Sequence, residues 1–369
     1  MSESVDARFE RAKQLFIEGL GLFEAGRFDA AERCFLDSLG LLPGRVSTLI
    51  NLAATQLKLG RPRDALATAA QVLAIEPDNL DAGFHRANAL AQLDRAEEAL
   101  AGYERLLSLD PTLAPVWSRR GGLLREMNRL DEAAEAFERA IALGADAQLN
   151  GYYLASVRGG SAPTTAPRSY VTSLFDEYAG QFDQHLLQVL QYRAHEVLLR
   201  QLQRLAPGPY ASALDLGCGT GLCGPLVRPM VGTLAGVDLS EQMLARARAL
   251  GVYDELVHGD IVEHLNRTPQ RPELVLAADV FIYVGELTQV FAGVQRVMPR
   301  GGVFCFTAER APDADDFVLR PSLRYAHSAR YLRTLAAQHG FDVIDVVHAP
   351  VREDQHDSIE GLFVYLKRQ

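Results

Sequence analysis

The sequence predicts an all-α helical-repeat solenoid followed by a doubly wound α/β domain. Three observations support this fold class. Small residues recur every 34 positions through the first 145 residues, which is the spacing of a stacked two-helix unit. From about residue 170, helical patterns alternate with short apolar runs, as in a mostly parallel sheet. Between these regions, residues 158–169 combine Gly, Pro, Ser and Thr without periodicity, and we interpret them as a linker.

The first region, residues 1–157, is predicted to form four tetratricopeptide repeats over about residues 12–145. Small residues twelve places apart within each repeat let its two helices pack closely. Turns between paired helices are expected where Gly, Asp or Asn tolerates a left-handed backbone. A capping helix is expected at about 147–157. The expected turn residues are Gly26, Gly60, Asp94 and Asn128. The small residues are Gly19 with Ala31, Ala53 with Ala65, Ala87 with Ala99, and Gly121 with Ala133.

The second region, residues 170–369, is predicted to contain seven strands and to begin with a helical segment over 170–205. The strands are expected at about 211–216, 233–238, 254–258, 273–278, 301–307, 341–348 and 359–366. In an open parallel sheet, ligands bind beyond the carboxyl ends of the strands. Polar residues at those ends are therefore the first candidates for a site.

The segment Ala213-Leu-Asp-Leu-Gly-Cys-Gly-Thr-Gly-Leu222 ends a strand in a turn that lets the backbone approach a ligand. Gly217, Gly219 and Gly221 lack the Cβ atoms that would block this approach. Their spacing differs from the Gly-x-Gly-x-x-Gly of NAD-binding folds, which favours S-adenosylmethionine as the cofactor. Asp238 ends the next strand, where such folds place a carboxylate on two ribose hydroxyls. An NAD-linked oxidoreductase is the weaker alternative.

These residues, with His258-Gly-Asp-Ile261, resemble the class I S-adenosylmethionine-dependent methyltransferases over roughly residues 170–369. Within that group the chain is most similar to bacterial methyltransferases that carry tetratricopeptide repeats. Three segments carry this likeness: Leu174-Phe-Asp-Glu-Tyr-Ala-Gly-Gln-Phe-Asp-Gln-His-Leu186, Asp279-Val-Phe-Ile-Tyr-Val-Gly285 and Arg324-Tyr-Ala-His-Ser328. The resemblance implies a Rossmann-like sheet of seven strands, the last two forming an antiparallel hairpin at its edge. It also implies S-adenosylhomocysteine as the product left after methyl transfer.

The resemblance further implies a role for each cofactor residue. The glycine turn would hold the methionine part, Asp215 would contact its amino group, and Asp238 would accept both ribose hydroxyls. Asp260 would accept from the adenine amino group, and a helical lid would bring Tyr178 or Phe182 to the cofactor. The implied set is Tyr178, Phe182, Asp215, Gly217, Cys218, Gly219, Gly221, Asp238, Leu239, Met243, Asp260, Ile261 and Asp279. One aspartate after a strand is commonly only a helix cap, but four at successive strand ends favour a shared site.

The acceptor side is less defined by the sequence. His327 and Glu309 are candidate catalytic residues, although each also fits a structural role, and Tyr283 is a candidate acceptor contact. The sequence Asp279-Val-Phe-Ile differs from the Asn/Asp-Pro-Pro-Tyr/Phe pattern of many enzymes that methylate planar amide or base nitrogens. The nucleophile is expected to be an oxygen or nitrogen of a small-molecule, carrier-bound or peptide acceptor, held between the repeats and the catalytic domain.

The repeats are expected to recruit that acceptor or a protein partner through their concave face, or to hold a second subunit in a homodimer. Candidate contacts on this face are Asn51, His85, Asn88 and Arg119. They do not reproduce the Lys/Asn/Asn/Lys/Arg set with which chaperone-adaptor repeats clamp a peptide terminus. A competing hypothesis is a repeat scaffold whose methyltransferase-like domain senses the cofactor without catalysis.

Composition narrows the remaining possibilities. The net charge of −10 and pI of about 5.4 disfavour a nucleic-acid binder. No run of about 18 apolar residues could cross a membrane, and the acidic N-terminus is unlike a signal peptide, so we expect a cytoplasmic protein. The cysteines lack paired metal spacing, and no metal site is predicted. They are Cys34, Cys218, Cys223 and Cys305.

Overall fold

The computed structural model describes residues 5–160, 162–178, 192–354 and 357–369. They form two compact units, which divide the chain between Arg158 and Gly159. The segment expected as a linker therefore groups with the second unit. Thr165 pairs with Val284, and the amide of Ala166 donates to the Tyr283 carbonyl at 2.9 Å, which ties this segment to the α/β unit.

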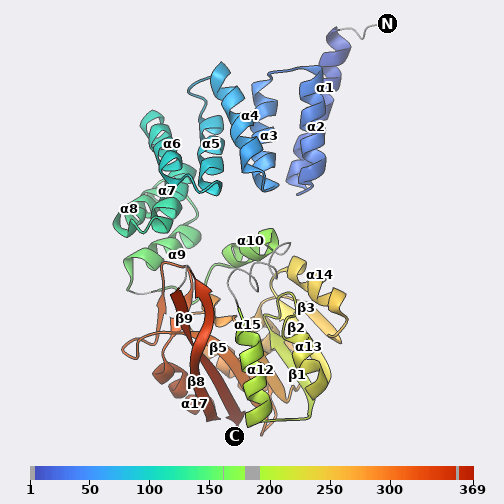
Figure 1. The fold of residues 1–369 in the computed structure, drawn as a ribbon, viewed down its shortest axis with the longest axis vertical. Helices are drawn as coiled ribbons and strands as arrows, with labels where there is room; N and C mark the ends of the chain where they lie inside the picture. The colour runs from blue at the N-terminus through green and yellow to red at the C-terminus, as the bar shows by residue number, and fades with distance from the viewer. Residues whose placement is uncertain (1–4, 161, 179–191, 355–356) are drawn as a thin grey trace. The chain divides into compact units, whose positions relative to one another are not determined.

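The first unit consists of helices arranged as consecutive antiparallel pairs, α1 with α2 through α7 with α8, followed by α9 (Figure 1). The turns within the pairs are those predicted: Gly26, Gly60, Asp94 and Asn128 all have φ between 58° and 71°. The helices are α1 (Val5–Glu24), α2 (Phe28–Leu41), α3 (Val46–Lys58), α4 (Pro62–Ile75), α5 (Leu80–Gln92), α6 (Ala96–Leu109), α7 (Ala114–Glu126), α8 (Leu130–Ala142) and α9 (Ala147–Arg158).

Close packing within the pairs explains the recurring small residues. A Cβ placed on Gly19 would lie 2.6 Å from Phe35, and one on Gly121 would lie 2.7 Å from Phe137. Both phenylalanines are fully buried. The paired helices therefore approach each other at positions where even an alanine would clash with an aromatic ring.

The second unit is built on a mixed sheet of nine strands within the described residues, with the order β3-β2-β1-β4-β5-β7-β6; β9 pairs with β5, and β8 with β9. The strands are β1 (Tyr210–Leu216), β2 (Val231–Asp238), β3 (Glu255–His258), β4 (Leu274–Ala277), β5 (Val303–Arg310), β6 (Phe317–Leu319), β7 (Tyr325–His327), β8 (Phe341–Asp354) and β9 (Asp357–Arg368). The seven predicted strands are present, and β8 and β9 form the expected antiparallel hairpin. The predicted count of seven strands is too low, because β6 and β7 were not predicted. Each of these strands has three residues, which is too short to show a periodic pattern.

Both faces of the sheet are buried, which explains the continuous apolar runs of its strands. Leu214 and Val275 face a core that includes helix α16, whereas Ala213 and Leu274 face another that includes helix α12. The helices of this unit are α10 (Arg168–Tyr178), α12 (Ala194–Leu205), α13 (Gly224–Val227), α14 (Glu241–Leu250), α15 (Ile261–Arg267), α16 (Thr288–Val297) and α17 (Ala329–Gln338). Two short 3₁₀ turns, η2 (Arg228–Met230) and η3 (Phe281–Tyr283), interrupt the connections. None of the helices described in either unit is long and apolar enough to cross a membrane.

Candidate functional site

Four strand-end aspartates of the second unit line one cavity of about 640 Å³. Asp215 and Asp238 lie within the last residues of β1 and β2, while Asp260 and Asp279 follow β3 and β4. These strands are parallel neighbours, so their carboxyl ends open to the same side of the sheet. Of the residues named from the sequence, the cavity is also lined by Gly217, Cys218, Gly219, Leu239, Met243, Ile261 and Tyr283.

The glycine turn after β1 has the left-handed backbone that its sequence requires. Gly217 has φ +64°, and a Cβ there would lie 2.6 Å from Val280. Gly219 has φ +55°, and a Cβ there would meet no protein atom within 4 Å, so its backbone faces open space in the cavity. The expectation that Gly221 faces the ligand is wrong. Gly221 does not line the cavity, and its missing Cβ makes room for Leu250 instead.

Asp238 connects the end of β2 to this turn. One carboxylate oxygen accepts from the Gly219 amide at 2.8 Å, and the other accepts from the Ser240 amide at 2.9 Å. Burial raises the pKa of Asp238, and these backbone hydrogen bonds oppose that rise. Each oxygen keeps acceptor capacity for a further donor in the cavity.

Asp215 is 1% exposed, and its carboxylate accepts a hydrogen bond from the Tyr253 hydroxyl at 2.7 Å. Burial raises the pKa of Asp215 to about 7, although the Tyr253 hydrogen bond lowers it. A cationic group bound beside this carboxylate would stabilise its ionised form. The site therefore suits a ligand that carries an ammonium at this point.

Asp260 has the structural role that a strand-end aspartate commonly has. Its Oδ1 accepts from the amides of Val262 and Glu263, at 2.9 and 3.0 Å, and so caps helix α15. Ile261 and Met243 are both buried beside the same cavity. They supply apolar surface next to the capped helix end.

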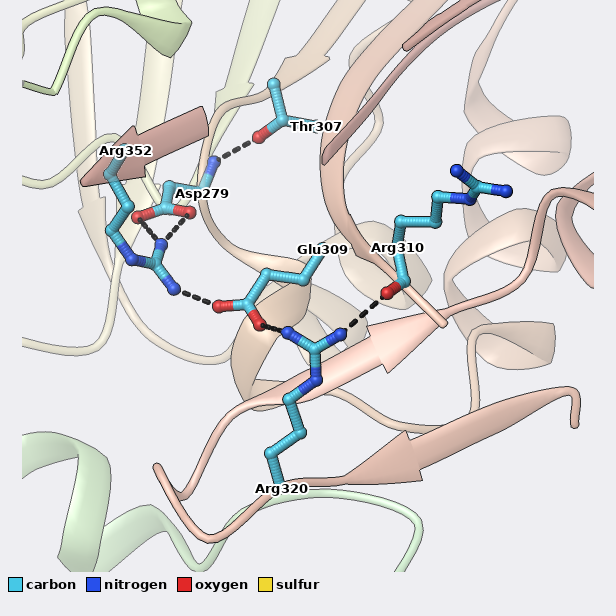
Figure 2. A network of polar contacts seen from close by, with 6 residues as sticks. All are labelled: Asp279, Thr307, Glu309, Arg310, Arg320 and Arg352. Carbon is cyan, nitrogen blue, oxygen red and sulfur yellow. Dashed lines mark hydrogen bonds and ion pairs between the residues drawn. The ribbon is translucent and has the colours of Figure 1, made fainter. Parts of the chain in front are cut away.

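Asp279 belongs to a chain of ion pairs at the other end of the cavity (Figure 2). The Arg352 guanidinium lies between Asp279 and Glu309, donating to the two Asp279 oxygens at 3.0 and 3.2 Å and to Glu309. Arg320 holds the other Glu309 oxygen at 2.8 Å. The expectation that Glu309 acts as a base is wrong in this structure: it is 2% exposed, does not line the cavity and has two arginines on its carboxylate.

The expectation that His327 is catalytic is also contradicted. His327 is fully buried on β7 and does not line the cavity. Its Nε2 lies 3.0 Å from the Val284 carbonyl and 2.9 Å from that of Gly285, so this nitrogen carries the hydrogen and donates. Burial lowers the pKa of His327 to about 4. The imidazole thus fixes the segment that follows Tyr283.

Several cavity residues were not predicted as site residues, although Arg324 lies in a segment that carries the family likeness: Tyr192, His195, Arg324 and Arg352. Nothing in the periodic pattern marks them, because the predicted strand ends before Arg352 and the others lie outside the strand-end positions. Phe182 and the side chain of Tyr178, expected to cover the cofactor, lie outside the described residues.

The four polar residues named on the repeats differ in their hydrogen bonds and in their burial. The Asn88 side chain accepts from the buried Tyr103 hydroxyl at 2.7 Å, and the Asn51 amide donates to the Ser47 carbonyl at 2.9 Å. These contacts lie within the helix pairs, so Asn88 in particular supports the repeat. Burial lowers the pKa of His85, whereas Arg119 is exposed.

Comparison with known proteins supports both halves of the architecture. Residues 214–306 match a family model described as a methyltransferase domain. Residues 56–118 and 114–144 match models of the tetratricopeptide repeat. These matches confirm the predicted combination of tetratricopeptide repeats with a methyltransferase domain.

Similar individual proteins each match only part of this chain. The chain is 30% identical over 159 residues to malonyl-[acyl-carrier protein] O-methyltransferase of Enterobacter lignolyticus, covering 43% of this chain and 59% of the relative. It is 26% identical over 159 residues to a probable S-adenosylmethionine-dependent methyltransferase of Mycolicibacterium smegmatis, covering 42% and 61%. The chain thus spans about three-fifths of these relatives. A solved 1,6-didemethyltoxoflavin-N1-methyltransferase of Burkholderia thailandensis is 15% identical, with a TM-score of 0.45 over 57% of this chain and 93% of that one.

Proposed function

We propose that the second unit transfers a methyl group from S-adenosylmethionine to an oxygen or nitrogen nucleophile. The observation that carries this proposal is that the glycine turn and four strand-end aspartates meet in one cavity. Its volume of about 640 Å³ lies in the usual range for small-molecule and cofactor sites. The matched methyltransferase-domain model covers the strands that supply three of those aspartates and the fourth aspartate itself.

The residues present suit each part of that cofactor. The open face of Gly219 admits the methionine chain, and buried Asp215 provides an acceptor for its ammonium. Asp238 is fixed by two backbone amides with acceptor capacity left for ribose hydroxyls. Apolar Met243 and Ile261 provide surface for a planar base. The bound cofactor would supply a methyl group on a positive sulfonium, and the chain would align an acceptor in line with it.

The acceptor proposed here is a small molecule, a carrier-bound group or a peptide. The name of the Enterobacter relative supports a carrier-bound acceptor methylated on oxygen, since that protein acts on malonyl-[acyl-carrier protein]. Incubation of the full chain with tritiated S-adenosylmethionine and a native extract tests the proposal. We expect label in a product beyond that formed by an Asp238→Ala variant. A catalytically silent scaffold would bind the cofactor and give no labelled product.

The repeats are proposed to deliver that acceptor or to bind a protein partner. The support is an exposed Arg119 and a half-buried His85 within the matched repeats, together with a half-buried Asn51 on helix α3. Because Asn88 holds Tyr103, Arg119→Ala is the cleaner test. Once an acceptor is known, this change should raise its Michaelis constant and leave cofactor affinity unchanged. A changed oligomeric state with intact acceptor kinetics would instead favour a role in dimer formation.

A further inference from the structure

Tyr253 contacts Asp215 from outside the cavity. Its hydroxyl donates to Asp215 Oδ2 at 2.7 Å, and Asp215 lines the cavity whereas Tyr253 does not. Within the described ranges, this is the only hydrogen bond that the Asp215 side chain makes. The carboxylate proposed to accept the cofactor ammonium is therefore held by a single tyrosine hydroxyl.

Two glycines leave room for the Tyr253 ring. A Cβ on Gly221 would lie 2.9 Å from Leu250 and 3.1 Å from this ring, and a Cβ on Gly224 would lie 2.8 Å from the ring. All three distances are shorter than ordinary van der Waals contact, so an alanine at either position would press on its neighbours. Neither glycine lines the cavity. Their small size therefore serves the approach of Tyr253 to Asp215 and not the approach of a ligand.

The backbone on either side of Tyr253 fixes its position. Helix α14 ends at Leu250, and Gly251 turns the chain with φ +65°. The Asp254 amide then donates to the Leu234 carbonyl on β2 at 2.8 Å. Between these two points, the Tyr253 ring packs against the core that contains Leu234. The hydroxyl is thus preorganised to donate to Asp215.

This hydrogen bond favours the ionised form of Asp215. Burial, followed by the charge of Asp215, raises the pKa of Tyr253, so the hydroxyl keeps its proton and donates it. Burial also raises the pKa of Asp215, the Tyr253 hydrogen bond opposes that rise, and the charge of Asp238 adds to it. An ammonium is held best by an ionised carboxylate. Tyr253 therefore acts in favour of the form that the cofactor requires.

The other titratable groups near Asp215 do not replace this effect. Burial raises the pKa of the neighbouring thiols and of the Tyr192 hydroxyl, so these groups are neutral near pH 7. Asp238 is an acid whose charge disfavours the ionised form of Asp215. Among the residues that the structure describes, no arginine, lysine or histidine forms an ion pair with Asp215. The neighbouring groups are Tyr192, Cys218, Cys223, Asp238 and Cys305.

We propose that Tyr253 is a positioning residue for cofactor binding, which holds the Asp215 carboxylate ionised and oriented for the cofactor ammonium. The inference rests on the proposed function, in which this cavity binds S-adenosylmethionine. Tyr253 itself touches neither cofactor nor acceptor. Its effect on binding passes through Asp215 alone, so it should depend on pH.

The variant Tyr253→Phe tests the proposal, because it keeps the ring beside the two glycines and removes only the hydroxyl. Without this donor the pKa of Asp215 should rise further, so more of the empty site is protonated at neutral pH. Titration calorimetry of the full chain measures the affinity for S-adenosylhomocysteine at several pH values. We expect the affinity of the variant to be at least about fivefold below that of the wild type near pH 7. The difference should shrink to about twofold or less near pH 9, where the carboxylate is ionised in both proteins.

Tyr210→Phe is the matched control. It removes a tyrosine hydroxyl that donates to the Ala206 carbonyl at 2.6 Å, and Tyr210 does not line the cavity. Its affinity for S-adenosylhomocysteine should equal that of the wild type at every pH. Proton release gives a second readout. Near pH 8, Tyr253→Phe should release more protons on binding than the wild type, because more of its Asp215 is protonated beforehand.

The possible outcomes separate this proposal from the proposed function. Equal affinities of Tyr253→Phe and the wild type near pH 7 overturn the role of Tyr253 and leave cofactor binding intact. A loss of affinity that is the same at every pH also overturns it, because a merely structural defect would act in that way. If the folded wild-type protein does not bind S-adenosylhomocysteine, the proposed function fails together with the role of Tyr253.

Discussion

Asp238 is fixed at the end of β2 by two backbone amides, and this geometry gives it a dual role. It closes the glycine turn through the Gly219 amide, and it presents its remaining acceptor capacity to the cavity. An aspartate that only shaped the turn would not need to line the cavity. A binding measurement can therefore test the proposed ribose contact separately from the role of Asp238 in the turn.

Asp238→Ala should lower the affinity for S-adenosylhomocysteine at least about tenfold, because hydrogen bonds to a charged acceptor are lost. Equilibrium dialysis with labelled cofactor measures this. The matched control is Asp254→Ala, which removes an aspartate that also accepts a strand amide, from Leu234, but lies away from the cavity. A folded Asp238→Ala variant with wild-type affinity would show that the carboxylate serves only the turn.

Asp215 gives cofactor binding a pH dependence with a defined sign. Burial raises the pKa of Asp215 to about 7, so below that pH the empty site holds a proton there. A cofactor ammonium favours the carboxylate and lowers this pKa, so binding releases the proton. Affinity should rise with pH up to about 7 and then level off. Calorimetry in buffers of different ionisation enthalpy should detect proton release near pH 6, and Asp215→Asn should abolish it. No proton release by the wild-type protein would contradict the ammonium contact.

At the scale of helices, the paired small residues of the repeats set how closely two helices approach. Gly121 and Gly122 are neighbours on α7 with opposite surroundings: a Cβ on Gly121 would lie 2.7 Å from Phe137, and one on Gly122 would meet nothing within 4 Å. They form a matched pair for testing the packing argument.

Gly121→Ala should destabilise the repeat unit by about 1–3 kcal/mol through overpacking against Phe137. Gly122→Ala should stabilise it by roughly 0.5–1 kcal/mol, because alanine is the better helix former. Urea unfolding of the full chain, monitored by its helical signal, gives the free energy of unfolding in the first transition. This free energy is compared between the two variants. Equal effects of both changes would mean that helix propensity, and not ring packing, governs this position.

The sequence predicts elements whose local pattern is strong. Asp94 and Asn128 indicated the turns because their residue types tolerate the left-handed backbone that the structure shows. The short β6 and β7 escaped prediction, since three residues carry no period. Strand β8 runs past its predicted end at residue 348 because it pairs only with β9, and an edge strand tolerates Pro350. That extension is what brings Arg352 to the cavity.

The residues of the candidate site also fall into two groups, those that the local sequence predicts and those that it does not. Asp215, Asp238 and the glycine turn were predictable because they lie at the ends of their strands or directly after them in sequence. The Arg352 contacts were not, because they join residues 73 and 43 positions away, and no local pattern encodes such pairings. His327 and Glu309 were chosen for their chemistry, and burial decided against both.

At the scale of the whole molecule, the cavity and the residues proposed to bind the cofactor lie in the second unit. We expect residues 159–369 alone to fold and bind S-adenosylhomocysteine with the affinity of the full chain. A fragment starting at residue 170 should be less stable, because it lacks the Thr165 and Ala166 contacts with Tyr283. Thermal unfolding with and without S-adenosylhomocysteine compares the two fragments. A folded longer fragment without binding would place part of the cofactor site in the repeats.

The central claim is that the cavity at the strand ends holds S-adenosylmethionine. Titration calorimetry of the full chain with S-adenosylhomocysteine and with NAD, side by side under one condition, tests it most directly. The glycine spacing and the positions of Asp215 and Asp238 predict saturable binding of one S-adenosylhomocysteine per chain and no detectable binding of NAD. Binding of NAD alone, or of neither ligand by the folded protein, would contradict the assignment.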